Sequence, residues 1–68
     1  MEIFSERLKE LRKEKGLTQK ELAQRILQSP TAIVYWEQNK HEPSASALKK
    51  ICKFFDVSAD YLLGIIDD

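Results

Sequence analysis

Few side chains in this 68-residue sequence have the types and spacing that catalysis requires. His41 is the single histidine and stands in a polar stretch with neither a cysteine nor a second histidine beside it, so we expect it in an exposed loop. Cys52 is the single cysteine and shares helical spacing with apolar residues, which predicts a small core side chain rather than a nucleophile. The sequence therefore predicts no enzyme, metal site or cofactor. The remaining candidates are carboxylates scattered over helix caps and the C-terminal end: Asp56, Asp60, Asp67 and Asp68.

Composition indicates one small globular domain over residues 1–68. Hydrophobic residues make up 43% and charged residues 32%, with both signs in equal number, so the formal net charge is zero. A neutral chain is a mark against nucleic-acid binding, because Lys and Arg neutralise phosphates, but the distribution of the charges decides. No stretch approaches the roughly 20 apolar residues of a membrane span, and the N-terminus does not resemble a signal peptide. We expect a soluble cytoplasmic protein without a membrane partner.

Apolar periodicity divides the chain into five short helices and predicts no sheet. The first helix is expected over residues 4–15, where Phe4, Leu8 and Leu11 recur at steps of four and three. Gly16 ends this helix, because glycine enters the left-handed region freely.

Capping residues place the next two helices. The sequence Thr18-Gln-Lys-Glu21 is a capping box that begins a second helix. This helix stops near Leu27 and Gln28, because Ser29 followed by Pro30 favours the start of a third helix, which runs to about residue 38.

Capping residues also place the last two helices. Asp56 takes the turn between them, Ser58 caps a short helix over residues 59–63, and Gly64 closes it. Ser44 caps the longer helix before that turn, whose apolar residues at helical spacing are Leu48, Ile51, Cys52 and Phe55. The expected fold class is therefore all-α, a compact five-helix bundle.

The second and third helices, joined by a three- or four-residue turn, have the helix-turn-helix layout, in which the second helix of the pair enters the DNA major groove. The residues around this pair resemble the phage-repressor family (Cro/CI, also called XRE) over nearly the whole chain. The matching segments are Arg7–Arg12, Gly16–Ala23, Ile33 with Trp36 and Glu37, Lys40, Pro43 and Ser44, and Val57–Gly64. The resemblance implies a lambda-repressor-like, sequence-specific transcriptional regulator of a prokaryote or phage, associated with the nucleoid. It also implies a repressor that binds double-stranded DNA as a dimer on a palindromic operator.

The resemblance further implies which residues contact DNA. Gln19 would donate to a phosphate from the start of the second helix, where the helix dipole favours an anion, although an exposed helical residue without that role is the alternative. Gln38, Asn39 and Lys40 match residues that grip phosphates after the third helix. The complete expected site is Thr18, Gln19, Gln28, Ser29, Pro30, Thr31, Val34, Tyr35, Gln38, Asn39 and Lys40, whereas Ala32, Ile33 and Trp36 would turn toward the core.

Arg12 and Glu37 match a partly buried ion pair that locks the third helix to its scaffold in this family. A bidentate arginine-carboxylate contact would suit this role. The alternative is two unrelated surface charges.

Two departures from the family pattern affect DNA readout. Leu27-Gln28 stands where the family has a small residue or glycine followed by an apolar residue, so either Leu27 accepts a positive φ or the turn is reshaped. The third helix also contains no Lys or Arg, which removes the usual contacts to guanine. We expect readout that favours A·T pairs, through Thr31, Gln28, Val34 and Tyr35.

Three questions stay open in the sequence. The apolar cluster of Leu62, Leu63, Ile65 and Ile66 either closes the core or meets a second copy of the chain. The rival interpretation is a protein-interaction module that uses Val34, Tyr35 and residues 65–66. A positive rim from Lys20, Lys40 and the ends of the first helix would favour DNA, and a neutral apolar third helix would favour protein.

The chain is expected to be either a complete small regulator or the DNA-binding part of a longer repressor, and no small-molecule ligand is indicated.

Overall fold

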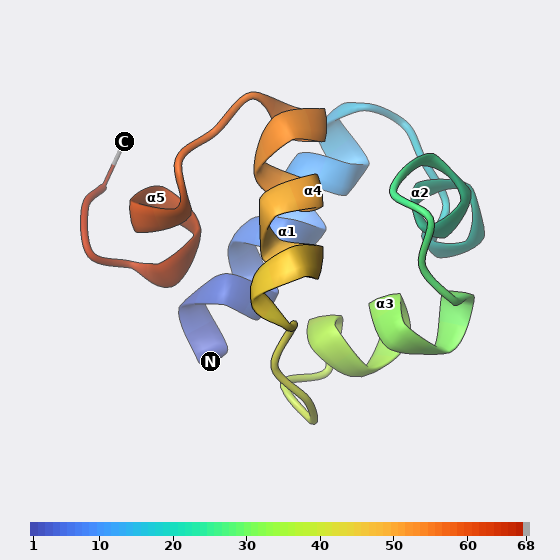
Figure 1. The fold of residues 1–68 in the computed structure, drawn as a ribbon, viewed down its shortest axis with the longest axis horizontal. Coiled ribbons are helices and arrows are strands. Elements are labelled where there is room, and N and C mark those ends of the chain that lie inside the picture. The colour runs from blue at the N-terminus through green and yellow to red at the C-terminus, as the bar shows by residue number, and fades with distance from the viewer. Residues whose placement is uncertain (68) are drawn as a thin grey trace.

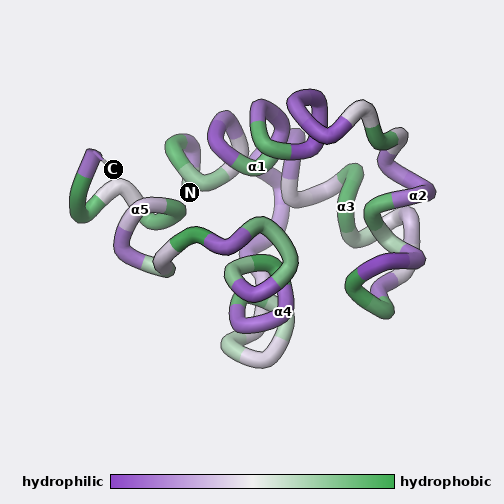
Figure 2. Tube along the Cα trace, turned by 90° about the horizontal axis from the view of Figure 1, so that it is seen from above, coloured by the Kyte–Doolittle hydropathy of each residue, from purple (hydrophilic) through white to green (hydrophobic). Residues whose placement is uncertain are grey.

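The computed structural model describes residues 1–67, and these residues form five helices and no strand. In chain order the helices are α1 (Glu2–Glu14), α2 (Gln19–Arg25), α3 (Pro30–Glu37), α4 (Ala45–Phe55) and α5 (Ala59–Leu63). In Figures 1 and 2, α1 and α4 lie across the middle of the molecule, with α2 and α3 at one end and α5 at the other. The predicted all-α five-helix fold is confirmed. None of the described helices is both long and apolar enough to cross a membrane.

The helix starts follow the capping residues that the sequence predicts. In α2, the Thr18 hydroxyl accepts a hydrogen bond from the Glu21 N–H at 3.1 Å, and the Glu21 carboxylate accepts one from the Thr18 N–H at 2.9 Å. Three serines accept a hydrogen bond from the backbone N–H three residues later and cap α3, α4 and α5; they are Ser29, Ser44 and Ser58.

The helix ends differ slightly from the prediction. α1 extends from Glu2, two residues before the predicted start, and ends at Glu14. α2 ends at Arg25, and α3 ends at Glu37 with Gln38 as its C-cap. Each of these three helices stops one or two residues early because a left-handed residue follows its last turn; these residues are Gly16, Leu27 and Asn39.

Leu27 is the unusual residue among these three, because it is neither glycine nor asparagine. Its φ is +57°, the Gln28 N–H donates to the Ala23 carbonyl at 2.8 Å, and the Leu27 N–H donates to the Gln24 carbonyl at 3.5 Å. This pattern is a Schellman motif, which satisfies the last carbonyls of α2. The turn therefore keeps its shape with Leu27 in the left-handed position. Of the two alternatives left open by the sequence, a positive φ at Leu27 or a reshaped turn, the structure has the first.

One hydrophobic core joins all five helices. Trp36 is 5% exposed and packs edge-on against Phe4, with ring centroids 6.4 Å apart, so it is a core anchor as predicted. Figure 2 shows hydrophobic positions recurring between hydrophilic ones along α1 and α4. The buried apolar residues are Phe4, Leu8, Leu22, Ala23, Ile26, Ile33, Trp36, Ala47, Ile51, Phe55 and Leu62.

The burial of Leu62 corrects one part of the sequence analysis. Leu62 is completely buried and closes the core under α5. Its side chain therefore cannot contact a second copy of the chain. Ile65 and Ile66 follow α5 and are 68% and 44% exposed. The apolar cluster thus divides between the core and the surface. Cys52 is half-buried against the core, as its apolar neighbours predict.

Candidate nucleic-acid interface

Arg12, Glu37 and Gln19 connect α1, α3 and α2 at one point. The Arg12 Nε donates to Glu37 Oε2 at 2.6 Å, and the Arg12 Nη2 donates to Glu37 Oε1 at 2.9 Å. The Gln19 amide nitrogen donates to the same Oε1 at 3.2 Å. The predicted bidentate pair is therefore present. The Gln19 contact was not predicted, and it fixes the side chain that the family resemblance assigns to a phosphate.

The ion pair between Arg12 and Glu37 is largely shielded from solvent. The side chains of Arg12 and Glu37 are only 12% and 2% exposed. The hydrogen bonds to Glu37 raise the pKa of the Arg12 guanidinium above its usual value, although burial acts in the opposite direction. Arg12 Nη1 also donates to the Leu17 carbonyl at 2.8 Å, so the same guanidinium holds the loop before α2.

Ser5 is a second anchor of α3 that the sequence analysis missed. Its side chain is buried, and its hydroxyl donates to the Trp36 carbonyl near the end of α3. Its position on the apolar face of α1, three residues before Leu8 and seven before Arg12, was the available signal. α1 therefore holds the end of α3 through both a backbone and a side-chain acceptor.

The outer face of α3 carries the predicted reading residues. Thr31, Val34, Tyr35 and Gln38 follow the spacing i, i+3, i+4, i+7, which places them on one face of the helix. Thr31 and Gln38 are exposed, Tyr35 is 36% exposed, and Val34 is half-buried. The opposite face carries Ile33, Trp36 and Glu37, which are buried.

The start of α3 presents a second part of the predicted site. Ser29 and Pro30 are exposed, while Gln28 is half-buried in the turn. The Ser29 hydroxyl accepts one hydrogen bond as the helix cap, so its O–H donor and one acceptor lone pair remain available. Thr18, at the start of α2, is likewise exposed and used as a cap.

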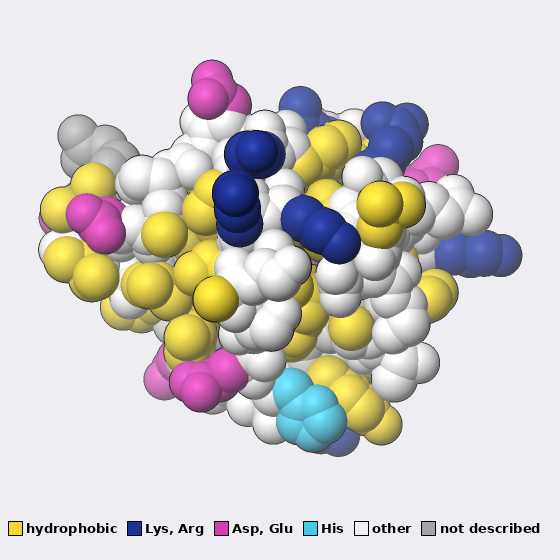
Figure 3. Space-filling model, in the orientation of Figure 1, with side chains coloured by type: hydrophobic (Ala, Val, Ile, Leu, Met, Phe, Trp, Pro, Cys, Tyr) yellow, Lys and Arg dark blue, Asp and Glu magenta, His cyan; other side chains and the backbone are white. Residues whose placement is uncertain are grey.

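The loop after α3 places Asn39, Lys40 and His41 together. All three are exposed, and Asn39 has a φ of +60° and accepts a hydrogen bond from the Met1 amino group at 2.7 Å. Lys40 Nζ lies 5.9 Å from the centre of the Tyr35 ring, and the His41 ring packs edge-on against Tyr35 at 4.8 Å. The single histidine, cyan in Figure 3, lies at the surface as predicted. Its contact with Tyr35 was not predicted.

Charge is sparse on this face. Glu37 is the only Lys, Arg, Asp or Glu residue within Pro30–Glu37, and Arg12 pairs with it. Exposed cations flank the helix instead, with Lys20 in the first turn of α2 and Lys40 after α3. The face is therefore polar and aromatic at its centre, with positive charge at its margins.

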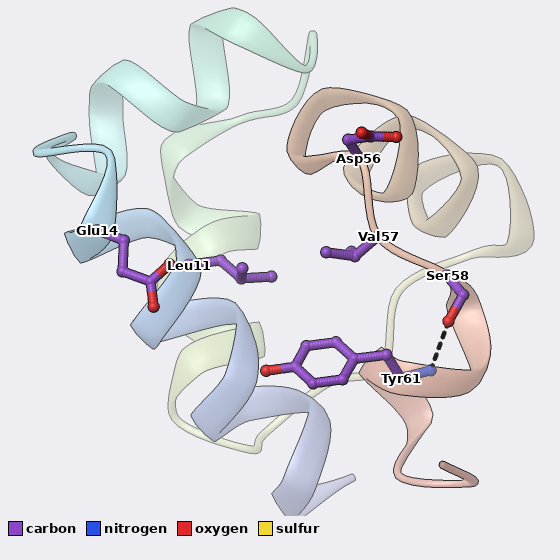
Figure 4. Close-up of a pocket in the computed structure, with 6 residues that line it drawn as sticks. All are labelled: Leu11, Glu14, Asp56, Val57, Ser58 and Tyr61. Carbon is purple, nitrogen blue, oxygen red and sulfur yellow. Dashed lines mark hydrogen bonds between the residues drawn. The ribbon is translucent and has the colours of Figure 1, made fainter. Parts of the chain in front are cut away.

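A hollow on the other side of α1 offers little for catalysis. It encloses about 390 Å³ between α1 and the turn from α4 to α5, where Leu11 and Val57 point toward each other (Figure 4). The Ser58 hydroxyl in its wall caps α5, and the carboxylates of Glu14 and Asp56 are on exposed residues. Among residues 1–67, no group of three or more His, Cys, Asp or Glu side chains could hold a metal ion.

Comparison with known proteins identifies the family. A helix-turn-helix family model matches residues 8–62, which include all of α2, α3 and α4. The chain belongs to this family. It is a helix-turn-helix domain of the kind found in DNA-binding transcriptional regulators, and the predictions of the family and of a non-enzymatic protein are confirmed.

Individual relatives are regulators of the same type. The chain is 48% identical over 61 residues to the HTH-type transcriptional activator BcrR of Enterococcus faecalis, matching 90% of this chain and 30% of BcrR. It is 36% identical over 62 residues to an uncharacterised HTH-type transcriptional regulator of Archaeoglobus fulgidus, matching 91% of this chain and 87% of that protein. The chain thus spans less than a third of BcrR, but most of the archaeal protein.

A solved structure has the same arrangement of helices. The DNA-binding domain of the P22 C2 repressor, determined by nuclear magnetic resonance, superposes with a TM-score of 0.80 and 33% sequence identity. The match covers 88% of this chain and 79% of that domain.

Proposed function

We propose that this domain binds a palindromic operator as a dimer, reads it with the exposed face of α3 in the major groove, and represses transcription. The observation that carries the proposal is the attachment of α3. Its inner face is fixed to α1 through Arg12, Glu37 and Ser5, whereas its outer face exposes Thr31 and Tyr35. A rigid scaffold beneath an exposed polar helix is what direct readout of bases requires.

Contacts to the DNA backbone would come from both sides of α3. Gln19 and Thr18 at the start of α2 would meet one phosphate, and Gln38, Asn39 and Lys40 would meet another. Gln19 still has a second amide N–H available after its contact with Glu37, so a phosphate can accept from it without breaking that contact. Phosphate contacts of this kind set the position of the helix without reading sequence.

The chemistry of the reading face favours A·T pairs. An asparagine or glutamine amide pairs with adenine, and methyl or aromatic groups contact the thymine methyl, whereas guanine is read mainly by Arg and Lys. Gln28, Thr31, Val34 and Tyr35 belong to the first two groups. We therefore propose an operator whose contacted positions are rich in A·T pairs.

The proposed dimer surface lies where the two ends of the domain meet. Ile3 of α1 lies against Gly64, since a Cβ atom on that glycine would be 2.9 Å from Ile3 Cδ1. Ile3, Ile65 and Ile66 are 45%, 68% and 44% exposed, and we propose that they act together as one apolar patch beside α5. Leu63 is half-buried at the end of α5 and lies at the margin of this patch. A dimer that reads both half-sites of a palindrome must hold its two reading helices about 34 Å apart, one turn of DNA.

Selection from random duplex DNA tests this function. We expect enrichment of a palindrome rich in A·T pairs, bound by two copies of the chain in sedimentation. Enrichment of no sequence, together with binding only at micromolar concentrations in low salt, would instead favour the protein-interaction module. A Lys9→Ala variant, changed on the exposed side of α1, is the matched control and should select the same site.

Repression is tested separately from binding. A reporter gene with the selected operator placed across its promoter should lose expression when the domain is produced. Increased expression would show an activator, which is the function named for the relative BcrR.

A further inference from the structure

A groove between the ends of α2 and α4 lies outside the interface described above. It encloses about 320 Å³, and none of its walls comes from α3. Its floor consists of Ile26, Leu27 and Phe54, and its rim consists of Arg25, Lys50 and Lys53. Figure 3 shows this face, where Lys and Arg side chains gather over α4 and beside α2 with hydrophobic atoms between them. We call this site the basic groove.

The rim is positive and lacks carboxylates. No Asp or Glu lines the basic groove, and the ion pairs within residues 1–67 are Arg7 with Asp67 and Arg12 with Glu37. Lys15 adds a fourth positive charge at the edge, with its Nζ 5.4 Å from the centre of the Phe54 ring. In a chain of zero net charge, this concentration of cations around an apolar floor favours an acidic ligand.

Leu27 is the most exposed apolar residue that lines the basic groove. Its side chain is 78% exposed, so it contributes little to the core. Its φ of +57° is a conformation that glycine adopts without the steric cost that an L side chain meets. Neither packing in the core nor the backbone conformation favours leucine at this position, so its apolar side chain is free to contact a ligand.

We propose that the basic groove docks an acidic amphipathic segment of a partner protein. Aliphatic or aromatic side chains of that segment would cover Ile26, Leu27 and Phe54, and its carboxylates would pair with Arg25, Lys50 and Lys53. The groove and the exposed face of α3 share no residue, and Leu27 of the groove adjoins Gln28 of the proposed DNA interface. The proposal is independent of the proposed function.

Other occupants fit the groove less well. A DNA phosphate would pair with the rim but leave the apolar floor in water. The chain's own apolar and acidic segment, residues 65–67, is held against α1, where Arg7 donates to the Ile66 carbonyl at 2.9 Å and lies 3.6 Å from the Asp67 carboxylate. A second copy therefore does not present that segment freely.

Titration with a defined peptide tests the proposal. The probe is a fluorescein-labelled amphipathic peptide of about four helical turns, with Leu and Phe on one face and Glu and Asp on the other. We expect saturable binding by anisotropy and chemical-shift changes at the amides of Leu27, Lys53 and Phe54. A peptide with Gln and Asn in place of its acids, and another with Ser in place of its apolar residues, should each bind roughly tenfold more weakly.

Variants of the groove separate docking from structure. Lys50→Glu with Lys53→Glu should weaken peptide binding by roughly tenfold or more, whereas Lys9→Glu on α1 should change it less than twofold. Leu27→Gly should also weaken peptide binding while leaving the unfolding temperature equal or higher, because glycine suits the left-handed position. A residue with a purely structural role would not produce that combination.

Several results would overturn the proposal. These are equal binding of the acidic and uncharged peptides, shift changes located away from the groove, and weakening by Lys9→Glu as large as that by the double variant. Random duplex DNA or vesicles of anionic phospholipid that shift the same amides more strongly than the peptide would assign the groove to phosphate. Shifts of these amides that depend on protein concentration alone would assign it to a second copy.

Discussion

Arg12 on α1 and Glu37 at the end of α3 form two parallel hydrogen bonds of 2.6 and 2.9 Å, from Nε and Nη2 to the two carboxylate oxygens. Gln19 on α2 donates to the same carboxylate, so three helices meet at one charged group. The end of α3 is therefore held by a carboxylate that it shares with α1 and α2.

Replacing Glu37 with Gln should destabilise the domain strongly. The substitution leaves the nearly buried Arg12 guanidinium without its counter-charge, and loss of one partner of such a pair costs about 3 kcal/mol. Urea unfolding followed by circular dichroism measures the change. Glu10→Gln, on an exposed residue of the same helix as Arg12, is the control and should cost less than about 0.5 kcal/mol. Equal losses for the two variants would contradict a structural role for the pair.

The capping box of α2 should make stability depend on acid pH. Hydrogen bonds with the backbone and side chain of Thr18 lower the pKa of Glu21 below its ordinary value of 4.5. The charged carboxylate therefore contributes its full stability above pH 4.5, and this contribution is lost as pH falls through the lower folded-state pKa. The difference in unfolding free energy between the wild type and Glu21→Gln should shrink below pH 4.5. A difference independent of pH between 7 and 3 would exclude this mechanism.

Substitution of the outer face of α3 should relax base preference. If Thr31 and Tyr35 contact bases, Thr31→Ala and Tyr35→Ala each lose about 1 to 3 kcal/mol of discrimination at one position of the operator. Competition between the selected duplex and single-base variants measures this loss. Ser46→Ala, on the exposed side of α4, should leave every ratio unchanged. Uniform weakening across all duplexes would show that the two side chains position the helix without reading sequence.

Lys40 and Gln38 should differ in their response to salt. Both alanine variants should weaken binding to all sequences similarly, because both residues would contact phosphates. Only the cation releases counterions, so Lys40→Ala should reduce the slope of log K against log salt by about one. An unchanged slope would remove Lys40 from the interface, and a reduced slope for Gln38→Ala would indicate that the variant alters docking as a whole.

Two glycines with positive φ offer a matched test of packing between the ends of the chain. Gly16→Ala meets no atom within 4 Å and should cost only the left-handed conformation, about 1 to 2 kcal/mol. Gly64→Ala meets the same conformational cost and also brings a Cβ within 2.9 Å of Ile3 Cδ1. Thermal unfolding should therefore show a larger loss for Gly64→Ala. Equal losses would mean that Ile3 moves aside without cost.

Local signals in the sequence were sufficient to predict the elements of this fold. Thr18, Ser29, Ser44 and Ser58 cap the helices that they were expected to cap, because a capping bond joins residues only three apart and depends little on the rest of the chain. The Arg12 and Glu37 pair was also expected, but from the family resemblance rather than from spacing.

Contacts between residues far apart in the chain could not be predicted from local sequence patterns. The Gln19 contact with Glu37, the Ser5 contact with Trp36 and the packing of His41 on Tyr35 depend on how whole helices are oriented. The five-residue α5 has barely more than one turn, so its periodicity does not separate the buried Leu62 from the half-buried Leu63 or from the exposed Ile65 and Ile66 that follow the helix. The sequence left two alternatives for the turn before α3, a left-handed Leu27 or a reshaped turn. The positive φ of Leu27 in the structure selects the first.

The absence of cations on α3 has a consequence for how such a domain would search a genome. If α3 binds DNA as proposed, few counterions would be released when it approaches random duplex, so attraction to non-operator DNA would be weak. Occupancy of an operator depends on the ratio of specific to non-specific binding multiplied by the number of competing sites. A small number of molecules per cell would then suffice to keep one operator filled, because the rest of the chromosome retains little of the protein.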